Sequence, residues 1–205
     1  MRYFCQAWGM VTLHLAQDPD ADALLAKDPL AVLTGLLLDQ QIPMEKAFSG
    51  PYVLATRLGM NRLDAEQIAG FDPDKFVAVF SETPAIHRFP KAMAERTQTL
   101  ARTVVDEYGG DAFALWTRAK DGADLLKRVS ALPGYGRQKA QILVALLGKQ
   151  FGVTPDGWRQ AAGDYGVEGS TRSVADVVDA TSLARVRAFK KELKAAAKAH
   201  AEAGR

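Results

Sequence analysis

The chain has few residues of the kinds that hold metals or form cross-links. Of its 205 residues one is a cysteine, Cys5, and three are histidines that lie far apart, His14, His87 and His200. A single cysteine excludes an intramolecular disulfide and a four-cysteine zinc or iron–sulfur site. The histidines show no metal-ligand spacing, so solvated or hydrogen-bonded roles are favoured for them. We therefore expect no metal centre and no iron–sulfur cluster.

Long apolar runs are also missing. The longest candidate, Ala31 to Leu38, is far shorter than the roughly 18 residues that suggest a membrane span. Residues 1–8 lack the basic-then-apolar layout of a secretory signal. Apolar residues make up 48% of the chain and charged residues 24%, which favours a folded domain over a disordered chain. We expect a cytoplasmic monomer with no membrane partner.

Charge is unevenly distributed along the chain, although the net charge is only +2. Residues 118–150 contain seven Lys and Arg against two Asp, and residues 181–205 contain seven against two Glu. Residues 1–28 carry a net negative charge. The two basic segments favour a polyanionic partner such as nucleic acid. Solvated faces of ordinary helices explain the same charges equally well.

Helical signals dominate the pattern. Asp28-Pro29 places an N-cap before a proline at the first helical position, and leucines at helical spacing follow. The clearest amphipathic helix, Pro90 to Tyr108, is stopped by Gly109-Gly110. Only Met10 to Leu15 resembles a strand. Further helices are expected over Met44–Leu58, after Asp64, after Asp72-Pro73, and over Asp121–Ser130, Arg137–Leu147 and Thr181–Glu202. Gly50-Pro51 is expected to kink or break the first of these, and residues 152–172 are expected to be irregular because they contain five glycines and a proline.

These signals predict an all-α fold. Residues 1–27 are interpreted as an N-terminal extension with one short strand, and residues 28–160 as the core. Residues 161–205 are interpreted as an irregular segment followed by a basic C-terminal helix that packs on the core.

The segment from Leu132 to Ala140 carries the most information about function, and it reads Leu-Pro-Gly-Tyr-Gly-Arg-Gln-Lys-Ala. Two glycines two residues apart, between two helices, permit a tight turn and a close approach of the backbone to a phosphate. The first N–H groups of the following helix would then point at the anion. The predicted DNA-binding residues of this segment are Gly134, Tyr135, Gly136, Arg137 and Lys139. The alternative is a purely structural turn between two helices.

This segment resembles the helix–hairpin–helix of the DNA glycosylase superfamily that includes endonuclease III and the bacterial 3-methyladenine glycosylases. The family hairpin reads Leu-Pro-Gly-hydrophobic-Gly-Arg-x-Thr-Ala, and a catalytic aspartate follows some eighteen to twenty residues after x. In this chain x is Gln138, and Asp156 lies 18 residues later. Residues 37–42 are similar to the family's Leu-Ser-x-Gln segment, whose glutamine lies at the DNA interface and corresponds to Gln41. Residues 88–110 resemble the Lys-Ala helix that precedes the hairpin.

The resemblance implies two helical lobes around a DNA-binding cleft. It also implies a monofunctional DNA glycosylase of base excision repair, associated with the nucleoid, that hydrolyses the N-glycosidic bond of a damaged base in duplex DNA. Asp156 would be the catalytic carboxylate, which stabilises an oxocarbenium-like sugar and deprotonates water. Asp164 is the nearby rival. Lyase members have a lysine at the position of Gln138, and because glutamine cannot form a Schiff base, lyase activity is not expected. Lys139 is interpreted as a phosphate contact, since it lies about 100° further round the helix. No cofactor is implied, apart from the monovalent cation that a hairpin of this kind can bind.

The base pocket is predicted to include Trp158 and Gln138, because aromatic and amide groups recognise a flipped base. Weaker candidates for stacking are Phe48, Tyr52, Trp116 and Tyr165. The loop before Pro90 contains candidates for a wedge into the duplex, namely Ile86, His87 and Phe89. The main alternative function is a non-catalytic helix–hairpin–helix DNA-binding protein, which has no need of a carboxylate beside a phosphodiester. A third is a helical interaction protein with basic faces.

Overall fold

The computed structural model describes residues 11–203, and within this range every regular element is a helix. The expected all-α class is therefore confirmed. The strand expected over Met10–Leu15 is not formed by residues 11–15, and Met10 lies outside the described residues, as does Cys5. In chain order the elements are α2 (Pro19–Lys27), α3 (Pro29–Leu38), α4 (Met44–Arg57), α5 (Ala65–Gly70), α6 (Pro73–Ser81), α7 (Pro90–Tyr108), α8 (Ala114–Thr117), α9 (Gly122–Ser130), α10 (Arg137–Gln150), α11 (Trp158–Ala162), the 3₁₀ turns η1 (Gly163–Gly166) and η2 (Val174–Asp176), and α12 (Ala180–Ala203).

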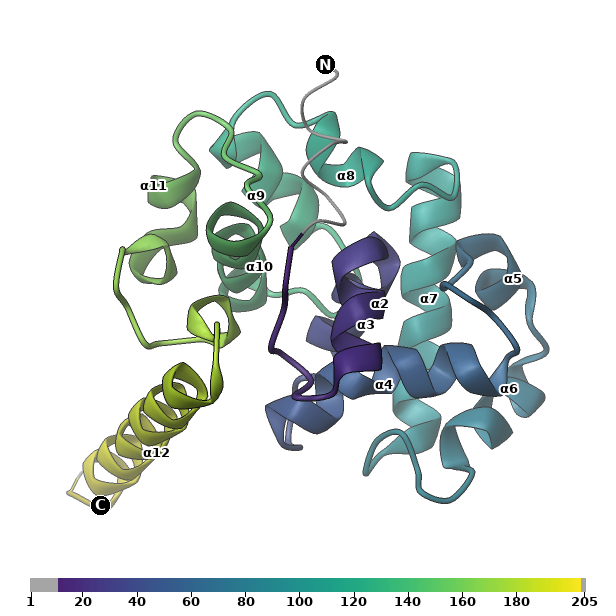
Figure 1. Cartoon of the computed structure of the whole chain (residues 1–205), viewed down its shortest axis with the longest axis horizontal. Helices are drawn as coiled ribbons and strands as arrows, with labels where there is room; N and C mark the ends of the chain where they lie inside the picture. Colours follow the sequence, from purple (N-terminus) through teal and green to yellow (C-terminus); the bar gives the residue numbers. More distant parts are fainter. Residues whose placement is uncertain (1–10, 204–205) are drawn as a thin grey trace.

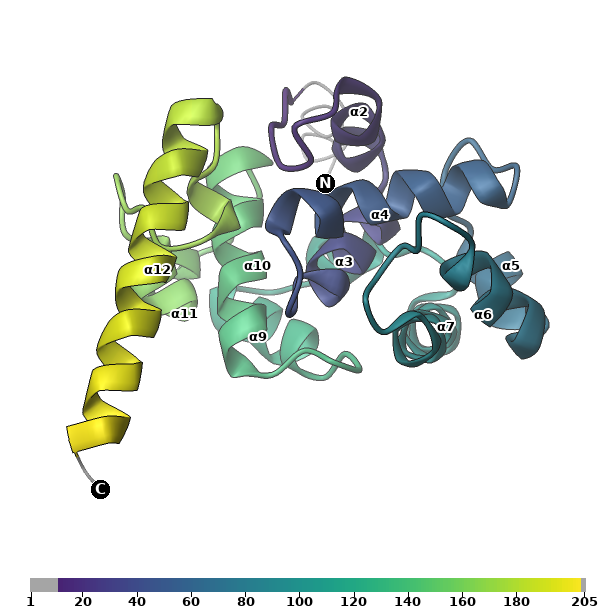
Figure 2. The ribbon, with the colours of Figure 1, turned by 90° about the horizontal axis from the view of Figure 1, so that it is seen from below.

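Helix α3 lies at the centre of the molecule. Every residue from Pro29 to Leu38 is buried, as expected of a helix that is apolar on all sides. In Figure 2, α3 lies between α5 to α7 on one side and α9 to α12 on the other, and α4 runs across it. Both groups of helices therefore pack around one shared element, and the two ends of α3 open onto different parts of the surface.

The described part of the segment interpreted as an N-terminal extension, residues 11–27, contributes to the core. Leu15 and Leu25 are fully buried. The carboxylate of Asp22, itself buried, accepts hydrogen bonds from the backbone N–H groups of Leu15 (2.8 Å) and Ala16 (2.9 Å). Asp18 caps α2 by accepting from the N–H of Ala21. Residues 13–27 therefore belong with the helices that follow them.

Other helices differ from the predictions in their course or their ends, and α10 continues to Gln150, three residues beyond the predicted end. Helix α4 continues through Pro51, where a kink or break was expected. The segment over residues 152–172, expected to be irregular, contains the short helix α11 and the turn η1. The last helix begins at Ala180, and the carboxylate of Asp179 accepts from the N–H of Ser182 in its first turn (2.6 Å).

Helix α12 packs on the rest of the molecule through its first half only. Leu183 and Val186 are buried, whereas Leu193 is 53% exposed. Beyond this point the helix runs away from the other helices towards the C-terminus (Figure 1). Its first half lies where it can contribute side chains to a surface shared with α3 and α10.

Candidate functional site at the end of helix α3

The turn between α9 and α10 contains the two glycines singled out in the sequence, and they differ in what they do. Gly134 has φ +81°, and a Cβ atom there would lie 2.5 Å from Cδ1 of Leu37. This glycine therefore lets the turn lie against α3. Gly136 is the N-cap of α10, has φ −71° and is exposed, with no side chain capping the helix. The first N–H groups of α10 are consequently left without a side-chain acceptor.

Tyr135 fixes the turn to α3 from within the core. The side chain is 3% exposed, and its hydroxyl donates a hydrogen bond to the carbonyl oxygen of Leu33 at 2.6 Å. Burial raises the pKa of the Tyr135 phenol well above its usual value. Its backbone N–H donates to the carbonyl of Leu132. The side chain of Tyr135 is thus unavailable to DNA, in contrast to the direct contact expected from the motif.

Lys139 also points into the protein. Its Nζ donates hydrogen bonds to the carbonyl oxygens of Leu36 and Leu37, both at 2.8 Å. These are C-terminal carbonyls of α3, which have no partner within their own helix. Burial lowers the pKa of the Lys139 ammonium to about 8. Lys139 therefore caps α3 in this structure and does not extend to the surface as a phosphate contact, while Arg137 is exposed.

A cavity of about 400 Å³ opens at this end of α3. It lies between the loop after α3, the start of α10, the turn η1 and the first half of α12. Three of the residues predicted from the sequence line it together, namely Gln41, Gln138 and Lys139. The cavity is also lined by Asp39, Arg172, Phe189 and Lys190, for which the sequence predicted no role. Its volume is in the range of small-ligand sites, so a single nucleobase would fit.

Asp39 supplies the carboxylate of this cavity. It is the residue that ends α3, and its side chain is 17% exposed. The Nζ of Lys190, on α12, lies 3.8 Å from its Oδ2. Asp39 lies within residues 37–42, the segment that resembles the family's Leu-Ser-x-Gln, and the resemblance implied no role for it. The available signal was its position two residues before Gln41.

The loop that carries Gln41 is held in place by a buried histidine. His87 is fully buried, with its Nε2 2.9 Å from the carbonyl oxygen of Gln40, and the N–H of Phe89 donates to its Nδ1 at 3.0 Å. The side-chain amide of Gln40 donates to the carbonyl of Leu37. Gln41 itself is exposed and has φ +58°, a conformation that non-glycine residues adopt only when their surroundings impose it.

The three residues predicted as candidates for the wedge differ in how far they are buried. Ile86 and His87 are buried, whereas Phe89 is 42% exposed, with the guanidinium of Arg88 4.7 Å from its ring centre. Only Phe89 of the three can reach a ligand without a change of structure.

The side chains of Gln138 and Tyr165, which both line the cavity, are joined by a hydrogen bond. The Nε2 of Gln138 donates to the hydroxyl of Tyr165 at 2.8 Å. Tyr165 lies in η1, which follows α11 as the chain runs back along α10. Asp164, its neighbour, is paired with Arg172 (Nη1 to Oδ2, 3.2 Å). The rival aspartate therefore lies close to the cavity.

Asp156 and Trp158 are placed at the opposite end of α10. The backbone carbonyl of Asp156 accepts from the N–H of Gly122, at the start of α9. The ring of Trp158 lies against Gly148, where a Cβ atom would meet it at 2.3 Å. Gly148 is ten residues from Gln138, which is about 15 Å along a helix. The structure therefore does not bring Asp156 or Trp158 together with the glycine turn and the cavity beside it.

Most of the weaker aromatic candidates lie away from this cavity. Phe48 is fully buried and Trp116 is 3% exposed, so both are core residues. Tyr52 is 37% exposed, on α4. Tyr165 is the one member of this group that lines the cavity.

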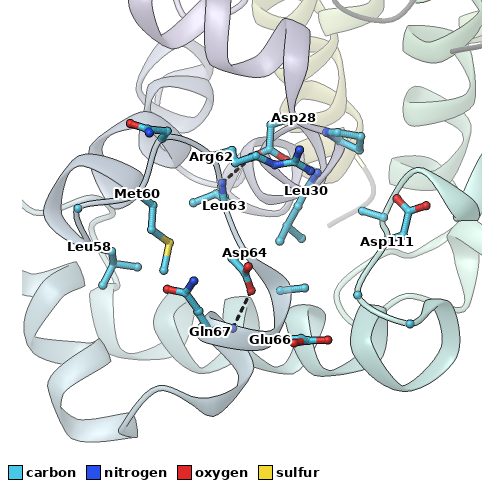
Figure 3. A pocket seen from close by; sticks show the side chains of 17 residues that line it. Asp28, Leu30, Leu58, Met60, Arg62, Leu63, Asp64, Glu66, Gln67 and Asp111 are labelled. Atoms are coloured by element: carbon cyan, nitrogen blue, oxygen red, sulfur yellow. Dashed lines mark hydrogen bonds between the residues drawn. The ribbon is translucent and has the colours of Figure 1, made fainter.

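A larger cavity, of about 660 Å³, lies at the other end of α3 (Figure 3). Its buried carboxylate, Asp28, accepts from the backbone N–H groups of Leu30, Ala31 and Leu63, the last at 2.6 Å. Asp64 accepts from the N–H of Gln67 and caps α5. Burial raises the pKa of Asp28. The hydrogen bond from Leu63 holds the loop before α5 on α3, so the carboxylates of Asp28 and Asp64 both have structural partners.

His87 makes the stability of the fold depend on pH. Burial, its main cause, lowers the pKa of His87 below its ordinary value. As pH falls below about 6.5 the unfolded chain takes up a proton at this residue before the folded chain does, so stability falls. We expect His87→Gln to flatten the decrease in the free energy of unfolding between pH 7 and 5, measured by urea titration. His14→Gln, at an exposed position, is the control and should leave the slope unchanged. An unchanged slope in His87→Gln would contradict this assignment.

No family model, no curated protein and no solved structure was found to match this chain. Within the described part of the chain, no three His, Cys, Asp or Glu side chains are grouped so that they could hold a metal ion. None of the helices over residues 11–203 combines the length and the apolar character that a membrane crossing requires. The monovalent cation, the monomeric state and the cellular location stay predictions.

Proposed function

We propose that this chain is a monofunctional DNA glycosylase that binds duplex DNA with the turn between α9 and α10 and takes a damaged base into the cavity at the end of α3. The observation that carries the proposal is the shared position of these two features. The exposed, uncapped start of α10 adjoins a cavity lined by a carboxylate, three glutamines and an aromatic hydroxyl. A binding surface for phosphate thus lies beside a site of the right size for one base.

The turn supports phosphate binding by its backbone. The N-terminus of a helix carries a partial positive charge and free N–H groups, which suits an anion. Gly136 leaves this end open, and Arg137 adds a full positive charge next to it. Lys139 contributes indirectly, because it fixes the end of α3 against which the turn lies.

Asp39 is the carboxylate that the cavity offers for glycosidic hydrolysis. Loss of the base leaves positive charge on C1′ of the sugar, and a carboxylate nearby stabilises that charge and accepts a proton from the attacking water. Asp39 lines the cavity with Gln41 and Gln138. Because Asp156 lies at the far end of α10, we assign this role to Asp39 in its place.

A non-catalytic duplex-binding protein is the second candidate. The separation of Asp156 from the turn favours it, since the carboxylate at the family's position is not beside the glycines. In that case the protein would bind duplexes and release no base.

The two candidates are separated by incubating the protein with duplexes that each carry one lesion and then treating them with alkali. The lesions are uracil, hypoxanthine, 8-oxoguanine and alkylated purines. Strand breakage that depends on alkali shows a released base and an intact abasic strand, as expected of an enzyme with glutamine at position 138. Duplex binding without breakage on any lesion would support the second candidate.

Arg137→Ala tests the binding surface. We expect it to weaken binding to all duplexes alike and to reduce the slope of log affinity against log salt by about one, since one phosphate contact is lost. The measurement is a fluorescence anisotropy titration at several salt concentrations. Lys75→Ala, an exposed cation on α6 at the other side of the molecule (Figure 1), is the matched control. If the two variants show the same salt dependence of duplex affinity, the turn does not contact DNA.

A further inference from the structure

The cavity at the end of α3 contains more positive than negative charge. Three cationic side chains line it, those of Lys139, Arg172 and Lys190, and the only carboxylate among its lining residues is that of Asp39. The carboxylate of Asp164 pairs with Arg172 from outside. The two lysines therefore face one carboxylate, and a net positive charge remains.

One of the aromatic rings that line the cavity already has a cationic side chain next to it. A cationic base is held most strongly by the faces of aromatic rings. Phe189 and Tyr165 are the aromatic lining residues. The guanidinium of Arg172 lies 5.3 Å from the centre of the Phe189 ring, so this ring already has a cation near it. A second cation would be repelled there.

From this arrangement, and resting on the proposed function, we infer that the site selects a neutral damaged base that departs as an anion, such as uracil or hypoxanthine, over a base that carries a positive charge, such as a 7-alkylguanine. A positively charged base is repelled by Lys139 and Lys190. An anionic leaving group is stabilised by the same side chains, at the moment when charge develops on it.

The reaction balances without a further reactant. The bond between C1′ and the base nitrogen breaks, and its electron pair stays on the base, whose oxygen accepts a hydrogen bond from a cationic side chain. Water adds to C1′ and gives its proton to the carboxylate of Asp39. The departing anion then takes up a proton from solvent.

The test measures binding, so that it does not depend on turnover. The probes are duplexes in which the lesion carries a 2′-fluoro sugar, because the electronegative fluorine slows cleavage by destabilising the oxocarbenium ion. One probe carries 2′-fluoro-2′-deoxyuridine, the other the 7-methylguanine analogue, and each is compared with its undamaged duplex. The variants are Lys190→Glu and Lys191→Glu. Both residues are exposed on α12, but only Lys190 lines the cavity.

We expect the parent protein to prefer the neutral lesion. Lys190→Glu should shift the ratio of the two affinities towards the cationic lesion by about tenfold, the size of reversing one partly screened charge. Lys191→Glu should shift it less than twofold. The inference is overturned if the parent prefers the cationic lesion, if it shows no preference, or if both variants shift the ratio equally. Failure to bind any duplex would instead overturn the proposed function.

Discussion

Asp39→Asn is expected to reduce base release by about 100-fold or more, the scale of losing a principal electrostatic or general-base group. The substitution keeps the size of the side chain and removes its charge and basicity. Duplex affinity should stay the same or rise, because one negative charge near the phosphates is lost. Single-turnover release of the base from a duplex with a confirmed lesion is the measurement, and anisotropy titration gives the affinity.

Asp156→Asn and Asp164→Asn are the matched controls for this result. Asp156 lies at the far end of α10, and Asp164 is turned to Arg172, so both variants should keep most of the activity. Full activity in Asp39→Asn together with a large loss in Asp156→Asn would restore the position predicted from the family motif. It would also require α10 and α11 to lie differently from the arrangement described above.

Gly134→Ala is expected to lower the free energy of unfolding by about 2 kcal/mol. A side chain at φ +81° costs about 1 kcal/mol or more, and the new Cβ atom would have to displace Cδ1 of Leu37, which lies 2.5 Å away. Urea denaturation of the two proteins measures the difference. Because the turn is held on α3 by this contact, duplex affinity should fall as well.

Gly136→Ala provides the contrast within the same motif. Gly136 has φ −71°, and nothing lies within 4 Å of the position of a Cβ atom. Its replacement should cost about 1 kcal/mol or less, because alanine is a poorer N-cap residue than glycine but meets no steric conflict here. Equal destabilisation of the two variants would show that the turn does not lie on Leu37.

The helices themselves were determined by local sequence. Helix α7 has the bounds predicted from its apolar stripe and its terminal glycine, Pro90 to Tyr108. Asp28, Asp72 and Asp121 each cap the helix that was predicted to follow them. These signals act within a few residues, through a side-chain oxygen and the N–H groups next to it, so a single sequence contains them in full.

The composition of the site was decided by tertiary structure. Gln41 and Lys139 were predicted to bind DNA and Gln138 to line the base pocket, and all three line one cavity. It could not show that the ammonium of Lys139 turns inwards to the carbonyls of α3, because that choice depends on a helix end about a hundred residues earlier in the chain. It also could not place Asp156, whose distance from the turn depends on the length of α10 and on the reversal of the chain after it.

The role proposed for Asp39 likewise depends on tertiary structure and not on local sequence. Its only local signal was its position after an apolar helix and two residues before Gln41. Its place opposite Gln138 and beside Lys190 arises only when α3, α10 and α12 pack together. Local hydrogen bonds and periodicity determine which segments are helical, whereas the neighbours of a side chain depend on contacts between distant segments, and those contacts form only in the folded protein.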